Sequence, residues 1–306
     1  MPTLRQLRYL AALAQERHFR KAAERVNVTQ PTLSTQLQEL ERTLQASLID
    51  RSAKTVTLTP LGQEVLNRAQ RVLADVQDIV DLAAASQHGI SGTVKLGVAP
   101  TLGPYLLPFV VPGLHARYPD LKLYVREGKP VELQEQVKSG QLDLVVSPLP
   151  INGAELTTIP LFREPLLVAF APDDPLAQKP KLKKTDLAGR NVLAIEPGHH
   201  LHDKVREICD TFGAHISRDY EGTSLDTLRL MVGMGVGIAF LPALYIRSEI
   251  SNRGEVEVRE LEAASLHRHI GIAWRERSVN AAVFEDIAQE IRTFAQDNLH
   301  EVTLLN

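Results

Sequence analysis

Apolar positions recur at steps of three and four residues over the first thirteen residues, which is the spacing of one face of an amphipathic helix. They are Leu4, Leu7, Tyr9, Leu10 and Leu13, and they predict a first helix that ends near Gln15. A second, short helix is predicted over residues 19–26, where the small residues Ala22 and Ala23 allow it to cross closely over a neighbouring helix.

A third helix is predicted after a tight turn at residues 27–28. Thr29 is placed as its N-cap, and Pro31 lies in the first turn, where the missing N–H costs nothing. Its inward positions are apolar: Leu33, Leu37, Leu40 and Leu44. Its outward positions are short, uncharged donors and acceptors: Gln30, Thr32, Ser34, Thr35, Gln36 and Gln38.

The uncharged outer face of this third helix predicts entry into a DNA major groove, because amides and hydroxyls there read base edges and phosphates. The alternative is a merely polar surface helix. We favour DNA binding because the helices and the turn follow the order and spacing of a helix-turn-helix. The expected DNA-binding residues are Thr29, Gln30, Pro31, Thr32, Ser34, Thr35, Gln38, Arg51 and Lys54.

Residues 50–59 predict a two-stranded wing, since Val56 and Leu58 alternate with polar residues. Arg51 and Lys54 precede them around a turn, where they would meet the DNA backbone or minor groove. For either residue alone, a solvated surface position is the alternative. Residues 1–59 are therefore expected to form a winged helix-turn-helix domain, all-α apart from the wing.

A single long helix is predicted from Thr59-Pro60, a second N-cap and early-proline signal, to about Ser86. Its apolar residues form a heptad seam: Val65, Ala69, Val72, Val76, Ile79 and Ala83, with Leu66, Leu73 and Val80 beside it. Packing against its own domain is one interpretation. Dimerisation is favoured, because two half-sites need two recognition helices on one spacer. Residues 60–88 are the expected linker helix, and residues 87–92 a hinge.

Strands and helices alternate in the remaining chain, which implies a parallel sheet. Strands are predicted at 94–98, 121–126, 142–147, 166–170, 192–195, 218–220, 238–241 and 269–274, and helices at 102–117, 131–138, 200–212, from 224, and 279–298. We expect a regulatory domain over residues 89–306. Its first lobe would span about 92–162 and 268–306, and its second lobe about 163–267.

Polar residues stand at several predicted strand ends, where open α/β sheets bind ligands and helix N-termini offer unpaired N–H groups. They are Thr101, Ser147, His199, His200, Thr223 with Ser224, and Arg275. Each alone is more simply a helix cap. Together they predict a small polar or anionic effector between the lobes.

The sequence motifs of several other functions are not found in this chain. The glycine-rich stretch 233–237 follows a helix and precedes a strand, the reverse of a dinucleotide fingerprint. No nucleophile elbow, Walker loop or paired metal-ligand motif occurs, so neither an enzyme, a cofactor nor a metal site is expected. No apolar run approaches the roughly 18 residues that cross a bilayer. Arg5 and Arg8 fall within a helical pattern rather than a signal peptide, so a cytoplasmic protein is expected.

Composition adds a charge asymmetry to this outline. The chain has 306 residues, more than one core usually supports, with 44% hydrophobic and 23% charged residues, as in folded proteins. Its net charge is −3, but residues 1–60 hold nine basic and five acidic residues, so they carry +4 and the remainder −7. Only this N-terminal region, called the head below, is therefore expected to contact DNA phosphates. The single cysteine, Cys209, excludes an intrachain disulfide.

The motifs of the head and the start of the linker helix resemble the LysR-type family of transcription regulators. They are Ala22-Ala23, the run Val28 to Ser34, Leu37, Leu40-Glu41 and the run Thr57 to Gly62. The resemblance covers the whole chain. It implies a winged helix-turn-helix, a linker helix, a two-lobed α/β effector domain of periplasmic-binding-protein architecture, and a homodimer that assembles to a tetramer. Double-stranded DNA with an interrupted palindrome, an effector and RNA polymerase are the partners it implies.

Within that family the sequence is most similar to the peroxide-sensing OxyR subfamily, in the runs 17–20, 103–108, 160–165, 186–189 and 223–229. That subfamily uses a Gly-His-Cys stretch and a later resolving cysteine. Here Gly198-His199 is followed by His200, and Cys209 aligns with the resolving position only.

One cysteine cannot form the intramolecular disulfide of that subfamily, and three interpretations of the signal remain open. The first is a bound small molecule. The second is Cys209 acting alone, through a sulfenic acid or an intersubunit disulfide. The third is a metal or other redox signal at His199, His200, His202 and Cys209, against which a polar, solvent-facing loop is the simpler explanation. A two-lobed enzyme or solute-binding protein is the alternative from another class, and the basic head and heptad helix argue against it.

Overall fold

The computed structural model describes residues 1–50, 56–88, 92–218, 220, 222, 224–250, 254–262 and 266–305, except for the side chains of residues 81–92. The chain divides into two compact units. The first comprises Met1–Gly89 and Lys138–Gln141, and the second comprises Ile90–Val137 and Leu142–Asn306. Each unit is described by itself.

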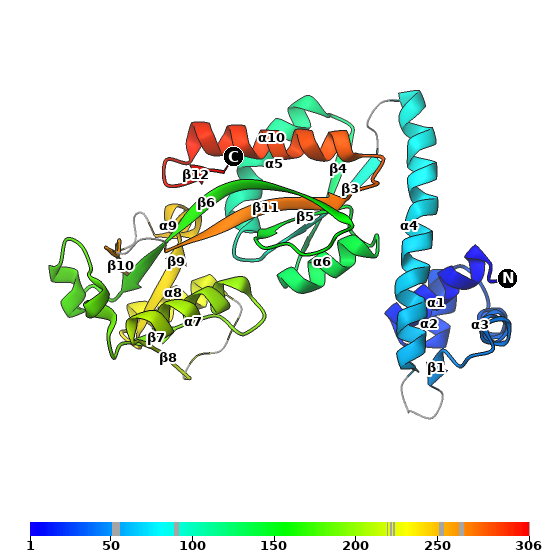
Figure 1. Cartoon of the computed structure of the whole chain (residues 1–306), viewed down its shortest axis with the longest axis horizontal. Helices are drawn as coiled ribbons and strands as arrows, with labels where there is room; N and C mark the ends of the chain where they lie inside the picture. The colour runs from blue at the N-terminus through cyan, green and yellow to red at the C-terminus, as the bar shows by residue number, and fades with distance from the viewer. Residues whose placement is uncertain are drawn as a thin grey trace. The chain divides into compact units, whose positions relative to one another are not determined.

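The first unit begins with the three predicted helices, α1 (Leu4–Glu16), α2 (Phe19–Arg25) and α3 (Gln30–Leu44) (Figure 1). The Thr29 hydroxyl caps α3 by accepting from the N–H of Thr32, and Asn27 adopts a left-handed φ of 55° in the preceding turn. Both features confirm the predicted turn and cap. The helices enclose a core that includes Tyr9, Leu10, Leu13, Ala22, Ala23, Leu33, Leu37 and Leu40. Leu4, predicted on the inward face, is exposed because it begins the helix.

A two-stranded antiparallel ribbon follows, formed by β1 (Ile49–Asp50) and β2 (Thr57–Leu58). Ile49 pairs with Leu58, and Asp50 with Thr57, which confirms the predicted two-stranded wing. The turn between these strands, with Arg51 and Lys54, lies outside the described residues.

The predicted long helix is α4 (Pro60–His88), of 29 residues. Thr59 caps the start of α4. Its hydroxyl accepts a hydrogen bond from the N–H of Gly62 at 2.9 Å and donates one to the Ser47 carbonyl at 2.8 Å. Gly62 packs on the chain before β1, and a Cβ there would stand 2.0 Å from the Leu48 carbonyl oxygen. Leu66 belongs to the core of this unit, so the beginning of α4 packs on its own domain.

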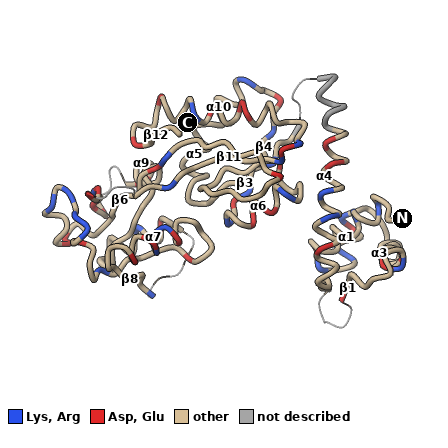
Figure 2. The backbone as a smooth tube through the Cα atoms, in the orientation of Figure 1, with Lys and Arg blue, Asp and Glu red and all other residues tan. Residues whose placement is uncertain are grey.

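The second unit is built on one long, mixed sheet with the order β4-β3-β5-β11-β6-β9-β7-β8 (Figure 1). Its strands are β3 (Gly92–Val98), β4 (Leu121–Glu127), β5 (Leu144–Pro148), β6 (Leu156–Phe170), β7 (Asn191–Leu193), β8 (His215–Ile216), β9 (Ile238–Pro242) and β11 (His267–Arg275). Two short strands, β10 (Glu257–Arg259) and β12 (Thr303–Leu304), also pair with β6. In Figure 2 the central strands are mostly tan, and charged residues lie chiefly on helices and loops.

The sheet serves two lobes, as predicted for the fold class. In the first lobe β4, β3 and β5 are parallel, and in the second lobe β9, β7 and β8 are parallel. The long strands β6 and β11 pair antiparallel between them. The lobes therefore share two strands.

Helices connect these strands. They are α5 (Gly103–Arg117), α6 (Pro130–Lys138), α7 (His200–Phe212), α8 (Leu225–Gly233), α9 (Ala243–Glu249) and α10 (Ala281–Asn298), with 3₁₀ turns at Pro175–Gln178 and Lys184–Leu187.

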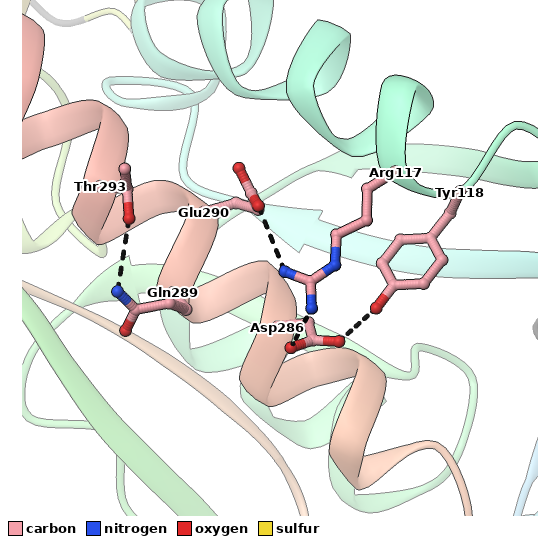
Figure 3. Close-up of polar contacts among 6 residues, drawn as sticks. All are labelled: Arg117, Tyr118, Asp286, Gln289, Glu290 and Thr293. Carbon is pink, nitrogen blue, oxygen red and sulfur yellow. Dashed lines mark hydrogen bonds and ion pairs between the residues drawn. The ribbon is translucent and has the colours of Figure 1, made fainter.

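Figure 3 shows the polar contacts between α10 and the end of α5. Arg117 donates to Asp286 at 3.0 Å and to Glu290 at 3.4 Å, and the Tyr118 hydroxyl also donates to Asp286. These contacts place α10 beside α5. No described helix meets the length and hydropathy of a membrane span.

One strand prediction for this unit was wrong, and another was too short. The strand expected at 218–220 lies earlier, at His215–Ile216, where it pairs with β7, and Arg218 and Tyr220 are outside any strand. The strand expected at 166–170 is the last third of β6. Pro160 and Pro165 obscured the earlier part of β6, and Pro160 lies beside a register shift, the place where strands tolerate proline.

Candidate DNA-binding surface and effector site

The outer face of α3 is an exposed surface without charge over its first two turns. Thr29, Gln30, Pro31, Thr32, Thr35 and Gln38 are exposed, and Ser34 is half-buried. The hydroxyls of Thr29 and Thr32 lie 2.8 Å apart and hydrogen-bond to each other. Gln36, which was predicted on the same face, is half-buried and accepts from the Gln6 amide of α1 at 3.4 Å. The exposed face is therefore narrower than the sequence suggested.

Elements of both lobes meet at a buried ion pair that the sequence did not reveal. Arg268 on β11 and Glu164 on β6 are opposite each other in register, and neither side chain is exposed. The Arg268 Nε donates to Glu164 at 2.8 Å, and its other two nitrogens donate to the Thr101 hydroxyl at 2.7 Å and the Thr101 carbonyl at 2.8 Å. The second Glu164 oxygen accepts the N–H of Leu244 in α9 at 2.9 Å.

This arrangement gives Thr101 a structural partner. Thr101 follows β3 in the first lobe, whereas Leu244 follows β9 in the second lobe. The ion pair therefore connects the ends of two strands from different lobes. Every nitrogen of the guanidinium and both oxygens of the carboxylate make a hydrogen bond, which lowers the desolvation cost of a buried ion pair.

Three other predicted effector residues carry buried polar atoms that have no hydrogen-bond partner among the described residues: the Ser147 hydroxyl, Nε2 of His199 and Nδ1 of His200. Such atoms are uncommon, because an unpaired buried polar group costs about 1–3 kcal/mol. Ser147 lies on β5, and the two histidines begin α7. These atoms are suited to bind a polar ligand.

The environment keeps both histidines neutral near pH 7. Burial lowers the pKa of His199, and the nearby charge of Lys129 lowers it further. Burial also lowers the pKa of His200, followed by the charge of Arg268. The backbone of Leu149, which follows β5, acts in the opposite direction and raises the pKa of His200 by a smaller amount. A neutral imidazole can both donate and accept, so this site does not require a charged ligand.

A second contact between the lobes lies beside His199. Lys129, before α6, forms an ion pair of 2.7 Å with Glu196, which follows β7. Its side chain also passes Gly198, where a Cβ would stand 3.2 Å from Lys129 Cδ, and Gly198 has a φ of 91°. Glu196 is 3.7 Å from His199 Nε2. Lys129 and Glu196 were missed because neither stands out in a single sequence.

Other predicted residues lie elsewhere. Arg275 is not near Ser147, because β11 runs antiparallel to β5 and its end lies at the beginning of β5. Arg275 instead donates to the carbonyls of Val137 and Leu142 at 3.1 and 3.3 Å. Thr223 lies outside the described residues, and Ser224 caps α8.

Cys209 and His202 are both buried on α7. Burial raises the pKa of the Cys209 thiol to about 11, so the thiolate, which is the reactive form, is scarce at neutral pH. Among the described residues, no group of three or more His, Cys, Asp or Glu side chains is arranged to hold a metal ion. His199, His200, His202 and Cys209, which the sequence left open as an alternative metal or redox site, form no such group.

A winged helix-turn-helix joined through a long helix to a two-lobed α/β domain is the architecture of a DNA-binding regulator. Two family models match the chain: "Bacterial regulatory helix-turn-helix protein, lysR family" over residues 4–63 and "LysR substrate binding domain" over residues 87–296. The chain belongs to the LysR family of DNA-binding transcriptional regulators.

Its relatives include peroxide regulators. The chain is 38% identical, over 94% of each chain, to the DNA-binding transcriptional dual regulator OxyR of Escherichia coli. It is 33% identical to a probable hydrogen peroxide-inducible genes activator of Streptomyces viridosporus, over 97% of this chain and 95% of that one. A full-length OxyR variant from Pseudomonas aeruginosa has a similar structure, with a TM-score of 0.80 and 37% identity over 95% of this chain and 94% of that chain.

Proposed function

We propose that this regulator reads DNA through the exposed face of α3 and responds to a small polar molecule bound between its lobes. Thr29, Gln30, Thr32, Thr35 and Gln38 would contact bases and phosphates in the major groove. Arg51 and Lys54 of the wing would contact the DNA backbone. The uncharged, exposed surface of α3 supports this assignment.

The exposed apolar residues of α4 support a dimer. Val72, Ile79 and Val80 are 42%, 67% and 55% exposed, although all three belong to the predicted heptad seam and its flank. A second α4 would cover them and hold two heads at half-site spacing. In this proposal two dimers form a tetramer, which occupies an interrupted palindrome in the cytoplasm and acts with RNA polymerase. Residues 1–59, 60–88 and 89–306 would be its three functional segments.

The buried, unpaired atoms of Ser147, His199 and His200 are the observation that carries the effector proposal. A ligand that donates and accepts hydrogen bonds would satisfy these atoms, and the ion pair of Lys129 with Glu196 would lie beside the ligand. The chain has one cysteine, and its thiol is buried, so a bound molecule explains the site better than a disulfide. Ligand binding would change the relation of the lobes and thereby the spacing of the heads.

DNA binding is tested by footprinting and by substitution on α3. We expect an extended, interrupted-palindrome footprint. Gln30→Ala should weaken specific binding by about 1–3 kcal/mol, because an amide that reads a base contributes about that much. Gln289→Ala, on the exposed side of α10, is the matched control and should leave binding unchanged. Protection of one short half-site by a monomer would contradict the proposal.

The signal is tested with Cys209→Ser and with the buried polar residues. We expect native mass spectrometry to find a small molecule carried by the purified protein, and Ser147→Val to abolish its retention. Cys209→Ser should retain DNA binding, ligand and regulation. Loss of peroxide-induced transcription in Cys209→Ser would instead establish a thiol mechanism.

A further inference from the structure

A cavity of about 260 Å³ lies where the two lobes meet, and it contains none of the proposed effector residues. Its lining comes from α5 of the first lobe, α9 of the second lobe and the residue after α10: Tyr105, Phe109, Leu244, Arg247, Ser248 and Leu299. Sites for drug-sized ligands measure about 300–1,000 Å³, so this cavity suits a smaller, single-ring molecule.

The walls of the cavity are largely aromatic and aliphatic. Phe109 is 48% exposed, and its ring stacks on Phe294 with centroids 5.4 Å apart and an interplanar angle of 10°. Tyr105 meets Tyr245 edge-on at 5.2 Å. Leu244 and Leu299 are buried. Flat rings beside aliphatic side chains favour a planar, apolar ligand body.

Polar groups stand at two places around this apolar lining. Tyr105 is only 9% exposed, and its hydroxyl has no hydrogen-bond partner in the part of the chain that the structure describes. Burial raises its pKa, so it remains a donor. Arg247 donates to the Asn298 carbonyl and forms a half-exposed ion pair with Glu301 at 3.6 Å. Exposed ion pairs are weak, so a ligand carboxylate can replace Glu301 beside this guanidinium.

The cavity wall is also connected to the buried ion pair between the lobes. The N–H of Leu244 is held by Glu164, which binds Arg268, and Arg268 in turn binds Thr101. A molecule that contacts both α5 and α9 would therefore restrain the elements at both ends of this chain of hydrogen bonds.

We propose that this cavity is a second ligand site, which binds a monocyclic aromatic carboxylate and restrains α9 against α5. The ring would lie between Phe109, Leu244 and Leu299. The carboxylate would bind Arg247, and the Tyr105 hydroxyl would donate to the same ligand. The site is separate from the effector residues of the proposed function and does not depend on them.

The test uses the full chain with benzoate as the probe and benzamide as its uncharged counterpart. Calorimetry should detect benzoate in the weak affinity range, up to tens of millimolar, and at least tenfold weaker binding of benzamide. Hydrogen exchange should slow in residues 243–249 when benzoate is bound. No heat and no change in exchange at saturating benzoate would overturn the proposal.

Variants locate the site. Arg247→Gln should weaken benzoate at least tenfold, whereas Arg277→Gln, a matched exposed arginine outside the cavity, should not. Ser248→Phe at the exposed rim should fill the cavity and abolish binding. If instead Ser248→Phe and Arg247→Gln bind benzoate normally while His199→Asn does not, the ligand occupies the effector site and the second site is refuted. Neither result bears on DNA binding, which is measured separately.

Discussion

Glu164 and Arg268 join the lobes at the scale of single residues. Each is buried and hydrogen-bonded to the other and to a further lobe element. A charge left in such a place without its partner is costly, whereas the intact pair itself contributes little net stability.

We therefore expect Arg268→Met to lower the free energy of unfolding by about 3–5 kcal/mol, because Glu164 is left uncompensated. The double variant Glu164→Leu with Arg268→Met should recover much of this loss, and urea denaturation of the full chain measures both. Equal losses in the single and double variants would show that packing, not charge, sets the cost.

Three histidines whose pKa values are lowered in the folded protein make stability depend on pH. Burial lowers the pKa values of His199, His200 and His267 in the folded protein, whereas an unfolded histidine titrates near 6.5. The unfolded chain therefore binds more protons below that pH, and the free energy of unfolding falls as pH drops through 6.5 toward the lowered folded values.

We expect His199→Asn to reduce this slope between about pH 7.5 and 5.5. His115→Asn, at an exposed position, is the control and should leave the slope unchanged. Thermal or urea unfolding across the pH range measures the effect. A steeper slope in His199→Asn would mean that His199 is charged in the folded protein.

The candidate site was predictable from sequence only in part. Thr101, Ser147 and the two histidines follow from strand ends, because helix starts and polar residues are visible there. Arg275 was also assigned to the site because it follows a strand, but it lies away from Ser147. The direction of β11 in the sheet depends on strand pairing, which a local sequence pattern does not contain. Arg268 was missed because it lies inside a strand, where an arginine resembles an outward-facing residue.

At the scale of elements, the start of α4 is fixed by a backbone contact. Gly62 lies against the Leu48 carbonyl, and a Cβ would approach that oxygen to 2.0 Å. Backbone cannot move aside as a flexible side chain can. The contact therefore fixes the direction in which α4 extends from the head.

Gly62→Ala should destabilise the first unit by about 1–3 kcal/mol, the range for overpacking, and weaken DNA binding. Gly113→Ala is the matched helical control, since its Cβ would meet only the end of the Glu290 side chain at 3.4 Å. That variant should be neutral or slightly stabilising because alanine favours helices. Unaltered unfolding and DNA affinity in Gly62→Ala would show that the head adjusts.

Element prediction succeeded where periodicity and caps agree. The three helices of the head, α4 and α10 have clear apolar faces, and α3 and α4 also have starting signals in the sequence. Strand β6 was partly missed because its prolines break the alternation, and β8 was misplaced because a two-residue strand has too few positions to show a period. These strands depend on pairing partners distant in sequence.

At the scale of the whole molecule, the exposed apolar residues of α4 predict association. Ile79→Lys should shift the protein toward monomers and reduce cooperative DNA binding, because a charge at a heptad position opposes helix pairing. Light scattering after size exclusion measures the mass. Asp75→Lys, at a neighbouring exposed position outside the seam, is the control. A monomeric control or a fully oligomeric Ile79→Lys would contradict the assignment.

The order of strands in the second unit also constrains how the chain is made. Strand β11 lies between β5 and β6, yet it is synthesised after the whole second lobe. During translation, β5 therefore lacks its pairing strand β11, and α5 lacks its contact with α10. Both are completed only when residues near 298 have left the ribosome. Because chains usually fold from the N-terminus as they emerge, the head can fold early while the first lobe stays incomplete. A truncated transcript would thus yield a DNA-binding fragment without a sensor.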